Sequence, residues 1–355
     1  MLGVWWSFAA AYVGAVVGAG FASGQESLTF FVVYGHSGLM GIILVSVGFM
    51  LMGGFSFMLA HALGDGSYRR VLEVICGTGW AKYYDIVVTC FLLAGVGVML
   101  AGAGSLMQQQ WGIHPLVGII ATACFTGASC IKGAKGVLFV NGLLVPVISV
   151  CAIVLGVNGL LKIWPSIRAH GLVVLWKSAP SALIPNWWLS GLIYLAYNSM
   201  LGIAACIPVA ATLPSRRFAF WGGMGGGLLL GILLLTGSLA LWGRGSSTAN
   251  SPIPLALVAD GIHPIFGNVY GIAIWFAMLT TAVTNLFAVV QRYGSGTQAA
   301  TVGMFLSVGL VLSLVGFGYL IGLLYPIFGY LGSVYVAKSL VYFSKDILRQ
   351  TNRRK

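Results

Sequence analysis

The stretch GAVVGAGFASGQE, residues 14–26, places a glutamate and several glycines inside an otherwise apolar segment long enough to span a membrane. Glu26 is the only acidic residue expected at membrane depth, and an ionisable group there marks a functional site by default. Glycine costs a helix about 1 kcal/mol per residue relative to alanine, so a simple anchor would not carry several at its centre. The residue types predict an interrupted helix with chemistry at the interruption.

An interrupted helix in lipid leaves backbone N–H and C=O groups without partners, which is tolerable where they line a cavity or bind something. The N-terminus of a half-helix attracts anions, and the C-terminus of the preceding half offers carbonyls to cations. We therefore expect a substrate site at the bilayer midplane; the alternative is a glycine-rich packing kink. The residues expected to line the site in this helix are Gly18, Ala19, Gly20, Phe21, Ala22 and Ser23.

Two roles for Glu26 are compatible with its position. The sequence SGQE has the S-x-x-E spacing of a capping box, with Ser23 as the N-cap of the resumed helix and Glu26 reaching back to the Ser23 N–H. Alternatively, Glu26 couples a proton or pairs with a ligand. An ionised Glu26 would weaken the attraction of the half-helix for anions, which favours a zwitterion or an amine as substrate.

A second interruption is expected in the segment YLAYNSMLGIAACIP, which places two polar residues in the middle of an apolar helix. Asn198 and Ser199 are the polar side chains expected in the substrate pocket. Aromatic side chains, of which Phe21 is one, are expected as its walls or gates. The others are Tyr194, Tyr197 and Trp275.

The composition indicates an integral membrane protein. The 355 residues are 59% hydrophobic and 7% charged, with a mean hydropathy of +0.98, and a crossing needs about 20 apolar residues. The chain begins without the basic n-region of a cleavable signal peptide. Ten spans are predicted, at 4–34, 39–61, 84–107, 115–131, 136–161, 187–213, 217–242, 264–290, 298–315 and 319–343.

The basic residues give the orientation. With a cytoplasmic N-terminus, 14 of the 18 Lys and Arg residues fall in inside segments and 4 outside, which fits the positive-inside rule with both termini cytoplasmic. The net charge of +12 is thus a topology signal and not the footprint of a nucleic-acid partner. The four outside residues are Lys162, Arg168, Lys177 and Arg244.

The longest outside connection divides the spans into two groups of five. Each group opens with an interrupted helix, which is the sequence signature of a transporter built from inverted repeats. The second helix of each group is rich in glycine, as close helix packing requires. The predicted units are 1–161, the outside connection 162–186, the second repeat 187–343, and a basic cytoplasmic tail 344–355.

The first-helix motif, the ten spans in two groups of five, and AMLTTAVTN in helix 8 resemble the amino acid–polyamine–organocation superfamily with the LeuT-type fold. Within it, the sequence is similar to the YkvI-type bacterial membrane proteins. The resemblance implies an all-α integral membrane protein of the inner membrane. Its ten transmembrane helices would form a 5+5 inverted repeat with helices 1 and 6 discontinuous.

The resemblance also implies a sodium site. In LeuT-type sodium symporters, helix 8 supplies one carbonyl and two hydroxyls to Na⁺, and helix 1 supplies two carbonyls. Threonine hydroxyls in membrane helices otherwise bond back to their own helix. Phe21 replaces a polar residue of those symporters, which puts a second sodium near the substrate in doubt. The matching positions here are Gly14, Val17, Ala277, Thr280 and Thr281.

The function expected is a symporter that moves a small amino acid or amine by alternating access, coupled to Na⁺ or H⁺. A ligand sensor that keeps the transporter fold is the alternative. No enzyme activity is expected, since Walker, GxSxG and HExxH motifs are absent. The six cysteines form no CxxC pair and are expected to be small packing residues. Na⁺ is the one possible bound ion, and the lipid bilayer and a small-molecule substrate are the expected partners.

Overall fold

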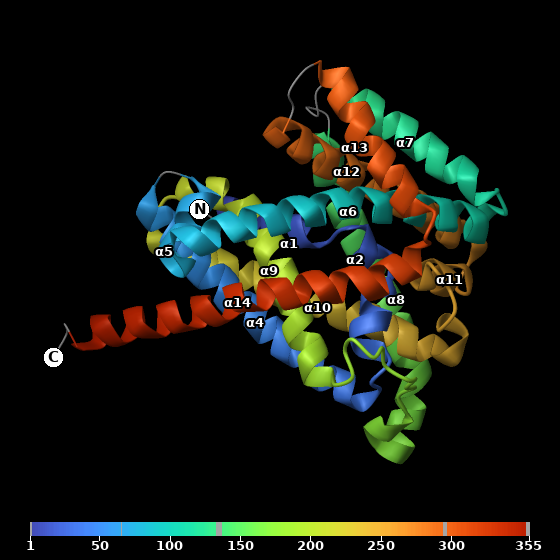
Figure 1. Ribbon diagram of the computed structural model, residues 1–355. Coiled ribbons are helices and arrows are strands. Elements are labelled where there is room, and N and C mark those ends of the chain that lie inside the picture. The colour runs from blue at the N-terminus through green and yellow to red at the C-terminus, as the bar shows by residue number, and fades with distance from the viewer. Residues whose placement is uncertain (1, 65, 133–136, 294–296, 353–355) are drawn as a thin grey trace.

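A computed structural model, which is all-helical, describes residues 2–64, 66–132, 137–293 and 297–352 (Figure 1). The helices are α1 (Leu2–Val16), α2 (Ala19–Ser23), α3 (Gln25–Ser27), the π-helix η1 (Leu28–Val32), α4 (His36–Leu63), α5 (Tyr68–Cys76), α6 (Thr78–Trp111), α7 (Pro115–Lys132), α8 (Val137–His170), the 3₁₀-helix η3 (Gly171–Val174), α9 (Trp187–Ala211), α10 (Arg216–Arg244), the 3₁₀-helix η4 (Gly245–Thr248), α11 (Pro254–Asp260), α12 (Pro264–Tyr293), α13 (Gln298–Ser313) and α14 (Phe317–Asn352).

Among the described residues, seven helices are long and apolar enough to cross a membrane, and the bent helix α9 makes an eighth. The seven include α4, α6, α10 and α12. Helix α13 is apolar but shorter, and the first predicted span consists of the short pieces α1, α2, α3 and η1. The chain is therefore a multi-pass membrane protein with seven or eight candidate spans, and the count of ten stays a prediction.

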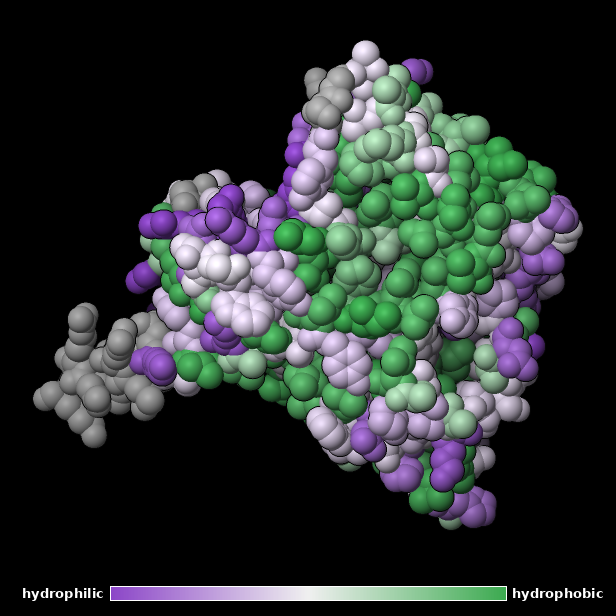
Figure 2. Space-filling view, in the orientation of Figure 1, coloured by the Kyte–Doolittle hydropathy of each residue, from purple (hydrophilic) through white to green (hydrophobic). Residues whose placement is uncertain are grey.

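The surface is consistent with a lipid environment. Figure 2 shows a broad hydrophobic area across the middle of one face, with hydrophilic residues gathered near α5 and along the opposite and lower edges. Large apolar side chains such as Ile86, Val150 and Val311 are exposed on the helices, as expected where lipid tails replace water.

The long helices form two packed groups. We call α1, α4, α9 and α10 the bundle, because each packs on others of this set, and α6, α7, α12 and α13 the frame for the same reason. The frame has an apolar core of its own, which includes Val96, Leu100 and Leu286. Helices of equal order in the two predicted halves pack together: α4 with α10, α6 with α12, and α7 with α13.

Glycines allow the backbones of the bundle to touch. A Cβ atom at Gly223 in α10 would lie 2.5 Å from the carbonyl carbon of Gly53 in α4. One at Gly227 would overlap the backbone of Met50. Both distances are far below van der Waals contact, so any side chain there would separate the helices. The glycine-rich second helices thus pack closely, as their composition predicted.

Helix α9 differs from the predicted discontinuous helix. Asn198 and Ser199 lie within continuous helix, and the axis bends by 50° between the segments Trp187–Ile203 and Ala205–Ala211. Pro208 explains the position of the bend, since a proline cannot donate to the carbonyl four residues earlier and its ring clashes there. The predicted interruption at Asn198 and Ser199 is therefore wrong in position.

Two predicted boundaries fall inside helices. Helix α8 runs on to His170 and is followed by η3, so the connection predicted at 162–186 begins as helix. The predicted tail at 344–355 continues α14 as far as Asn352, and Figure 1 shows this end projecting from the body. Both boundaries were placed where apolarity ends, whereas a helix persists into water while its backbone hydrogen bonds remain intact. Residues 353–355 lie outside the described residues.

Candidate functional site

The first helix is interrupted after Val16. The Gly18 N–H bonds to the carbonyl of Val16 at 2.8 Å, so the carbonyl of Gly14, four residues earlier, loses its helical partner. Gly18 is extended, with φ −91° and ψ −173°, and α2 begins at the next residue. A Cβ atom at Gly18 would meet no atom within 4 Å. The chain therefore leaves open space at this interruption.

A second turn follows at Gly24, whose φ of +82° favours glycine. Leu255 of α11 packs where a Gly24 side chain would lie, 2.5 Å from an added Cβ. The hydroxyl of Tyr270 donates to the Ala22 carbonyl at 2.7 Å, which satisfies one carbonyl at the end of α2. Two short helices in succession thus replace a stretch of regular helix, and partners from α11 and α12 hold them.

The capping box predicted for Ser23 and Glu26 is not formed. Ser23 is the last residue of α2, and its hydroxyl donates to the Gly20 carbonyl at 2.8 Å and accepts from the Gln25 N–H at 3.2 Å. Glu26 turns away from it toward α9. The left-handed turn at Gly24, which the S-x-x-E spacing does not reveal, is the physical reason.

Glu26 is 4% exposed and is the one charged residue among the buried polar side chains that the structure describes. The hydroxyl of Tyr197 donates to its Oε2 atom at 3.0 Å. Its Oε1 atom occupies the space beside Gly20, where an added Cβ would overlap it. The rings of Tyr194 and Tyr325 pack against the ring of Tyr197. Gly20 therefore makes room for the glutamate of its own chain rather than for a ligand.

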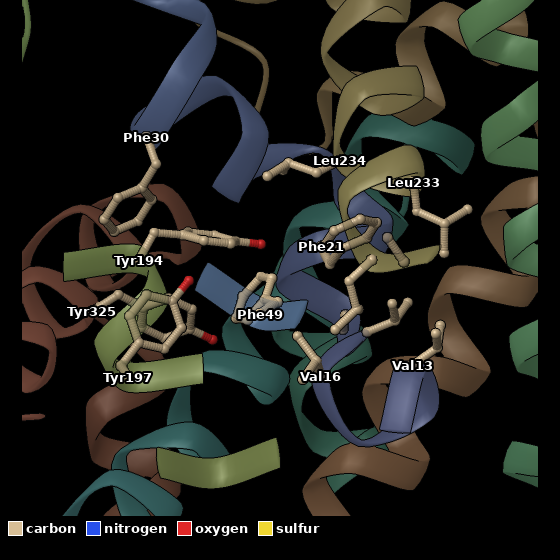
Figure 3. Close-up of a cluster of buried hydrophobic side chains, with 14 of the residues drawn as sticks. Val13, Val16, Phe21, Phe30, Phe49, Tyr194, Tyr197, Leu233, Leu234 and Tyr325 are labelled. Atoms are coloured by element: carbon tan, nitrogen blue, oxygen red, sulfur yellow. The ribbon is translucent and has the colours of Figure 1, made fainter. Parts of the chain in front are cut away.

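The tyrosines around Glu26 belong to a cluster of aromatic rings. Ring centroids lie 5.4 Å apart for Tyr194 and Tyr197 and 5.0 Å apart for Tyr197 and Tyr325, with interplanar angles of 75° and 53°. Phe30 lies 5.3 Å from Tyr194, and Phe91 of α6 lies 5.5 Å from Tyr325. Figure 3 shows the three tyrosine hydroxyls on the side of their rings that faces Phe49. We call these five residues the aromatic cluster.

Several buried polar atoms on the same helices lack a hydrogen-bond partner. They are Gln25 Oε1, Ser27 Oγ, the Tyr194 hydroxyl and Ser199 Oγ, together with Ser238 Oγ on α10. Buried polar atoms are nearly always satisfied by protein, water or a ligand. These orphaned atoms mark places around the interrupted helix where water or a bound molecule completes the hydrogen bonding.

The structure brings together most of the predicted substrate residues. Residues 19–23 form α2 and are buried, as are Tyr194, Tyr197, Asn198 and Ser199 on α9. The Asn198 amide donates back to the Tyr194 carbonyl at 3.1 Å. Figure 3 places Phe21 near Leu233 and Leu234, on the other side of Phe49 from the tyrosines.

Trp275 is not part of this cluster. Its indole N–H donates to the Thr122 hydroxyl of α7 at 3.0 Å, and its ring packs edge-on against Phe125. Trp275 therefore ties two helices of the frame together and does not form a wall of the predicted pocket.

The predicted sodium ligands come from the first helix and from α12. Val17 is buried in the break between α1 and α2, and α2 packs against α12. Ala277 and Thr280 are buried on α12, and the Thr280 hydroxyl donates to the Ala277 carbonyl at 3.2 Å. Thr281 is half-buried. Helix α1, which carries Gly14, packs against α9 and α10, whereas α12 packs against α2, α6 and α8. The Gly14 carbonyl is available, but the helix that carries it packs in the bundle.

Sequence reasoning missed Tyr325, Tyr270 and the C-terminal end of α6. Gln109 there accepts from Ser251 Oγ at 2.8 Å and from the Ile253 N–H at 3.1 Å, and Gln110 donates to Asp260 at 2.7 Å. These bonds hold α11 and the segment before it against α6. The run QQQW at the end of an apolar helix was the available signal, whereas Tyr325 lies in an unbroken apolar run.

Comparison with known proteins supports this architecture. No protein-family model matches the chain. The uncharacterized membrane protein YkvI of Bacillus subtilis (strain 168) is 27% identical over 340 residues, which cover 93% of each chain. The uncharacterized protein YyaD of the same organism is 25% identical over 339 residues, 93% of this chain and 94% of its own. The chain is a YkvI-like membrane protein.

Solved structures give the fold of this YkvI-like protein. MhsT in complex with L-phenylalanine matches with a TM-score of 0.61 and 17% identity, covering 94% of this chain and 87% of its own. Mhp1, a nucleobase-cation-symport-1 family transporter in a closed conformation with bromovinylhydantoin bound, matches with a TM-score of 0.53 and 13% identity, covering 86% and 70%. The fold is therefore LeuT-like.

Proposed function

We propose that this YkvI-like protein is a secondary active transporter that moves a small amino acid or amine by alternating access, coupled to Na⁺ or H⁺. The observation that carries the proposal is a buried carboxylate, Glu26, beside a helix that is interrupted inside a LeuT-like fold. Interrupted helices at membrane depth are maintained where they line a cavity or bind a solute. The fold matches bind small molecules, L-phenylalanine and bromovinylhydantoin.

The full architecture belongs to the same proposal. It comprises ten spans, a 5+5 inverted repeat with helix 1 discontinuous and helix 6 broken at the 50° bend of α9, and both termini on the cytoplasmic side of the bacterial inner membrane. The packing of α4 with α10, α6 with α12, and α7 with α13 supports it, because helices related by an inverted repeat meet at the pseudo-twofold axis. The excess of Lys and Arg in the inside segments supports the orientation.

The proposed substrate site lies between α2 and α9. Gly18 contributes open space, and the buried polar groups Glu26, Asn198 and Ser199 contribute hydrogen-bonding capacity. Coupling has two candidate routes. A proton on Glu26 is one; Na⁺ held by carbonyls and hydroxyls of α1 and α12 is the other.

Reconstitution into proteoliposomes tests the proposal. We expect saturable counterflow of a radiolabelled solute from a panel of amino acids and amines, and accumulation driven by a gradient of either H⁺ or Na⁺. The ligand sensor, the alternative function, binds a member of the same panel without moving it. Binding without counterflow would therefore replace the transporter with the sensor.

A further inference from the structure

The carboxylate of Glu26 has no positive partner among the described residues. The hydroxyl of Tyr197 of α9 donates to it, and the rings of Tyr194 of α9 and Tyr325 of α14 pack against the Tyr197 ring. Gly20 of α2 lies against the carboxylate, and Phe30 of η1 and Phe91 of α6, which also pack against the Tyr197 ring, are uncharged. A buried charge without a partner is strongly destabilising.

Two states of the site remove this cost. In one, a proton occupies Glu26 and the carboxyl group is neutral. In the other, a cation binds beside the ionised carboxylate and supplies the missing charge. The site has the same net charge in both states when the cation is monovalent, so the two occupants exclude each other.

The aromatic cluster decides which kind of cation fits. The rings of Tyr194 and Tyr325 stand at 75° and 53° to that of Tyr197, and Phe91 stacks on Tyr197 at 26°. The face of an aromatic ring attracts a cation within about 6 Å of its centroid, and such rings are the recurrent way to recognise organic ammonium groups. The tyrosine hydroxyls and the unpartnered Ser199 Oγ add acceptors for the N–H groups of an amine.

From these contacts we infer that Glu26 and the aromatic cluster bind the ammonium group of a small, monovalent organic cation in exchange for a proton. On binding, the O–H bond of the protonated carboxyl breaks and its proton passes to water. The ammonium group then pairs with the carboxylate that remains. The transport of this cation rests on the proposed function, whereas its binding does not.

Binding of defined probes to the purified protein in detergent tests the inference. The probes are methylamine, ethanolamine and choline as chlorides, with L-alanine, potassium acetate and sodium chloride as controls at equal ionic strength. Choline is permanently charged, so any pH dependence of its binding comes from titration of the protein. Thermal shift and titration calorimetry are measured from pH 5 to pH 9, and calorimetry in buffers of different ionisation enthalpy counts the protons released.

We expect at least one organic cation to raise Tm at pH 9, with up to one proton released for each cation bound. At pH values where Glu26 of the free protein is protonated, the apparent affinity for the cation should fall by about tenfold for each further unit of pH decrease. Glu26→Gln should lose the shift and the proton release while keeping its fold. Glu73→Gln, which alters an acidic residue paired with Arg69 on the surface of α5, should behave like the parent.

Three results would overturn the inference. They are equal affinity for the amines in Glu26→Gln, a shift with L-alanine and none with the cations, and no shift with any member of the panel. Proton release by sodium chloride alone would also overturn it, and would make Glu26 a sodium ligand. Counterflow in proteoliposomes remains a separate measurement. Counterflow of a zwitterion without amine binding would reject this inference and support the proposed transporter. Amine binding without flux would support this inference and reject the transporter.

Discussion

The interrupted helix and the frame differ in how each accommodates a carboxylate. Asp85 at the start of α6 pairs with Arg292 of α12 at 2.7 Å, and the same arginine donates to Thr89. Both partners are partly exposed, at 37% and 29%. Glu26 is buried, with phenol hydroxyls in place of a cation. The frame compensates its charge internally, whereas the interrupted helix leaves its charge for something that binds.

The two regions also differ in the regularity of their backbone. The frame is made of continuous helices with an apolar core of their own. The first helix instead ends at Val16, resumes, and turns again at Gly24. Backbone irregularity and uncompensated charge therefore coincide in one segment, which is the combination expected of a binding site on a rigid support.

The largest effect is expected from Gly24→Ala, compared with Gly64→Ala. Both glycines have positive φ, +82° and +73°, and a non-glycine residue in this conformation costs about 1–2 kcal/mol. At Gly24 the added Cβ also overlaps Leu255, whereas at Gly64 it meets nothing. We expect a fall in stability of about 3 kcal/mol for Gly24→Ala and about 1 kcal/mol for Gly64→Ala, since overpacking costs about 1–3 kcal/mol. Equal losses of Tm in detergent would show that α11 does not hold the turn.

The second comparison is Gly20→Ala against Gly18→Ala. The Cβ at position 20 overlaps Glu26 Oε1 and displaces the carboxylate from Tyr197, whereas the Cβ at position 18 enters open space. We expect Gly20→Ala to lose about 1–2 kcal/mol of stability, because the displaced hydrogen bond leaves buried groups unpaired. Gly18→Ala should keep the parent Tm without ligand. Its effect on solute binding measures whether that space belongs to the site, and an unchanged affinity would exclude it.

Residue type identified Glu26 and the glycines, because a charge or a flexible backbone in an apolar segment is costly wherever it occurs. Residue type also placed two tyrosines near the interruption: Tyr194, one turn before Asn198, and Tyr197, directly before it. The contribution of Tyr325 was not predictable, because it depends on α14 meeting α9 across more than a hundred residues of chain. Trp275 was assigned to the pocket for its aromatic character, but helix orientation turns it toward α7.

Two predictions from local sequence patterns failed because a second pattern overlapped the first. The S-x-x-E spacing is correct for a capping box, yet Gly24 adopts a left-handed conformation inside it and changes the direction of the chain. In α9, the polar pair Asn198 and Ser199 attracted the predicted interruption. Pro208 in the same segment was the stronger physical signal, since proline removes a helical hydrogen bond whereas asparagine can return its amide to its own helix.

A smaller effect is expected at the other carboxylate. Asp85→Asn removes the ion pair with Arg292, and for partly exposed partners the loss is about 0.5–1 kcal/mol and shrinks further in high salt. Solute affinity should stay at the parent value. We expect Tm in low and high potassium chloride to differ less for the variant than for the parent. A loss of solute binding in Asp85→Asn would break the distinction between a supporting frame and a binding helix.

The smallest effect on stability is expected from Thr281→Ala, which tests whether sodium joins the two regions. Thr281 is half-buried on α12, so the loss of its hydroxyl should change stability by less than about 0.5 kcal/mol in potassium chloride. A sodium ion between α1 and α12 would bind the folded protein only, and would raise Tm in sodium chloride relative to potassium chloride by mass action. We expect Thr281→Ala to remove most of any such increment, because one of five proposed ligands is lost. If the rise in Tm in sodium chloride survives in Thr281→Ala, this ligand set is excluded. If the parent protein shows no such rise, coupling is assigned to the proton on Glu26.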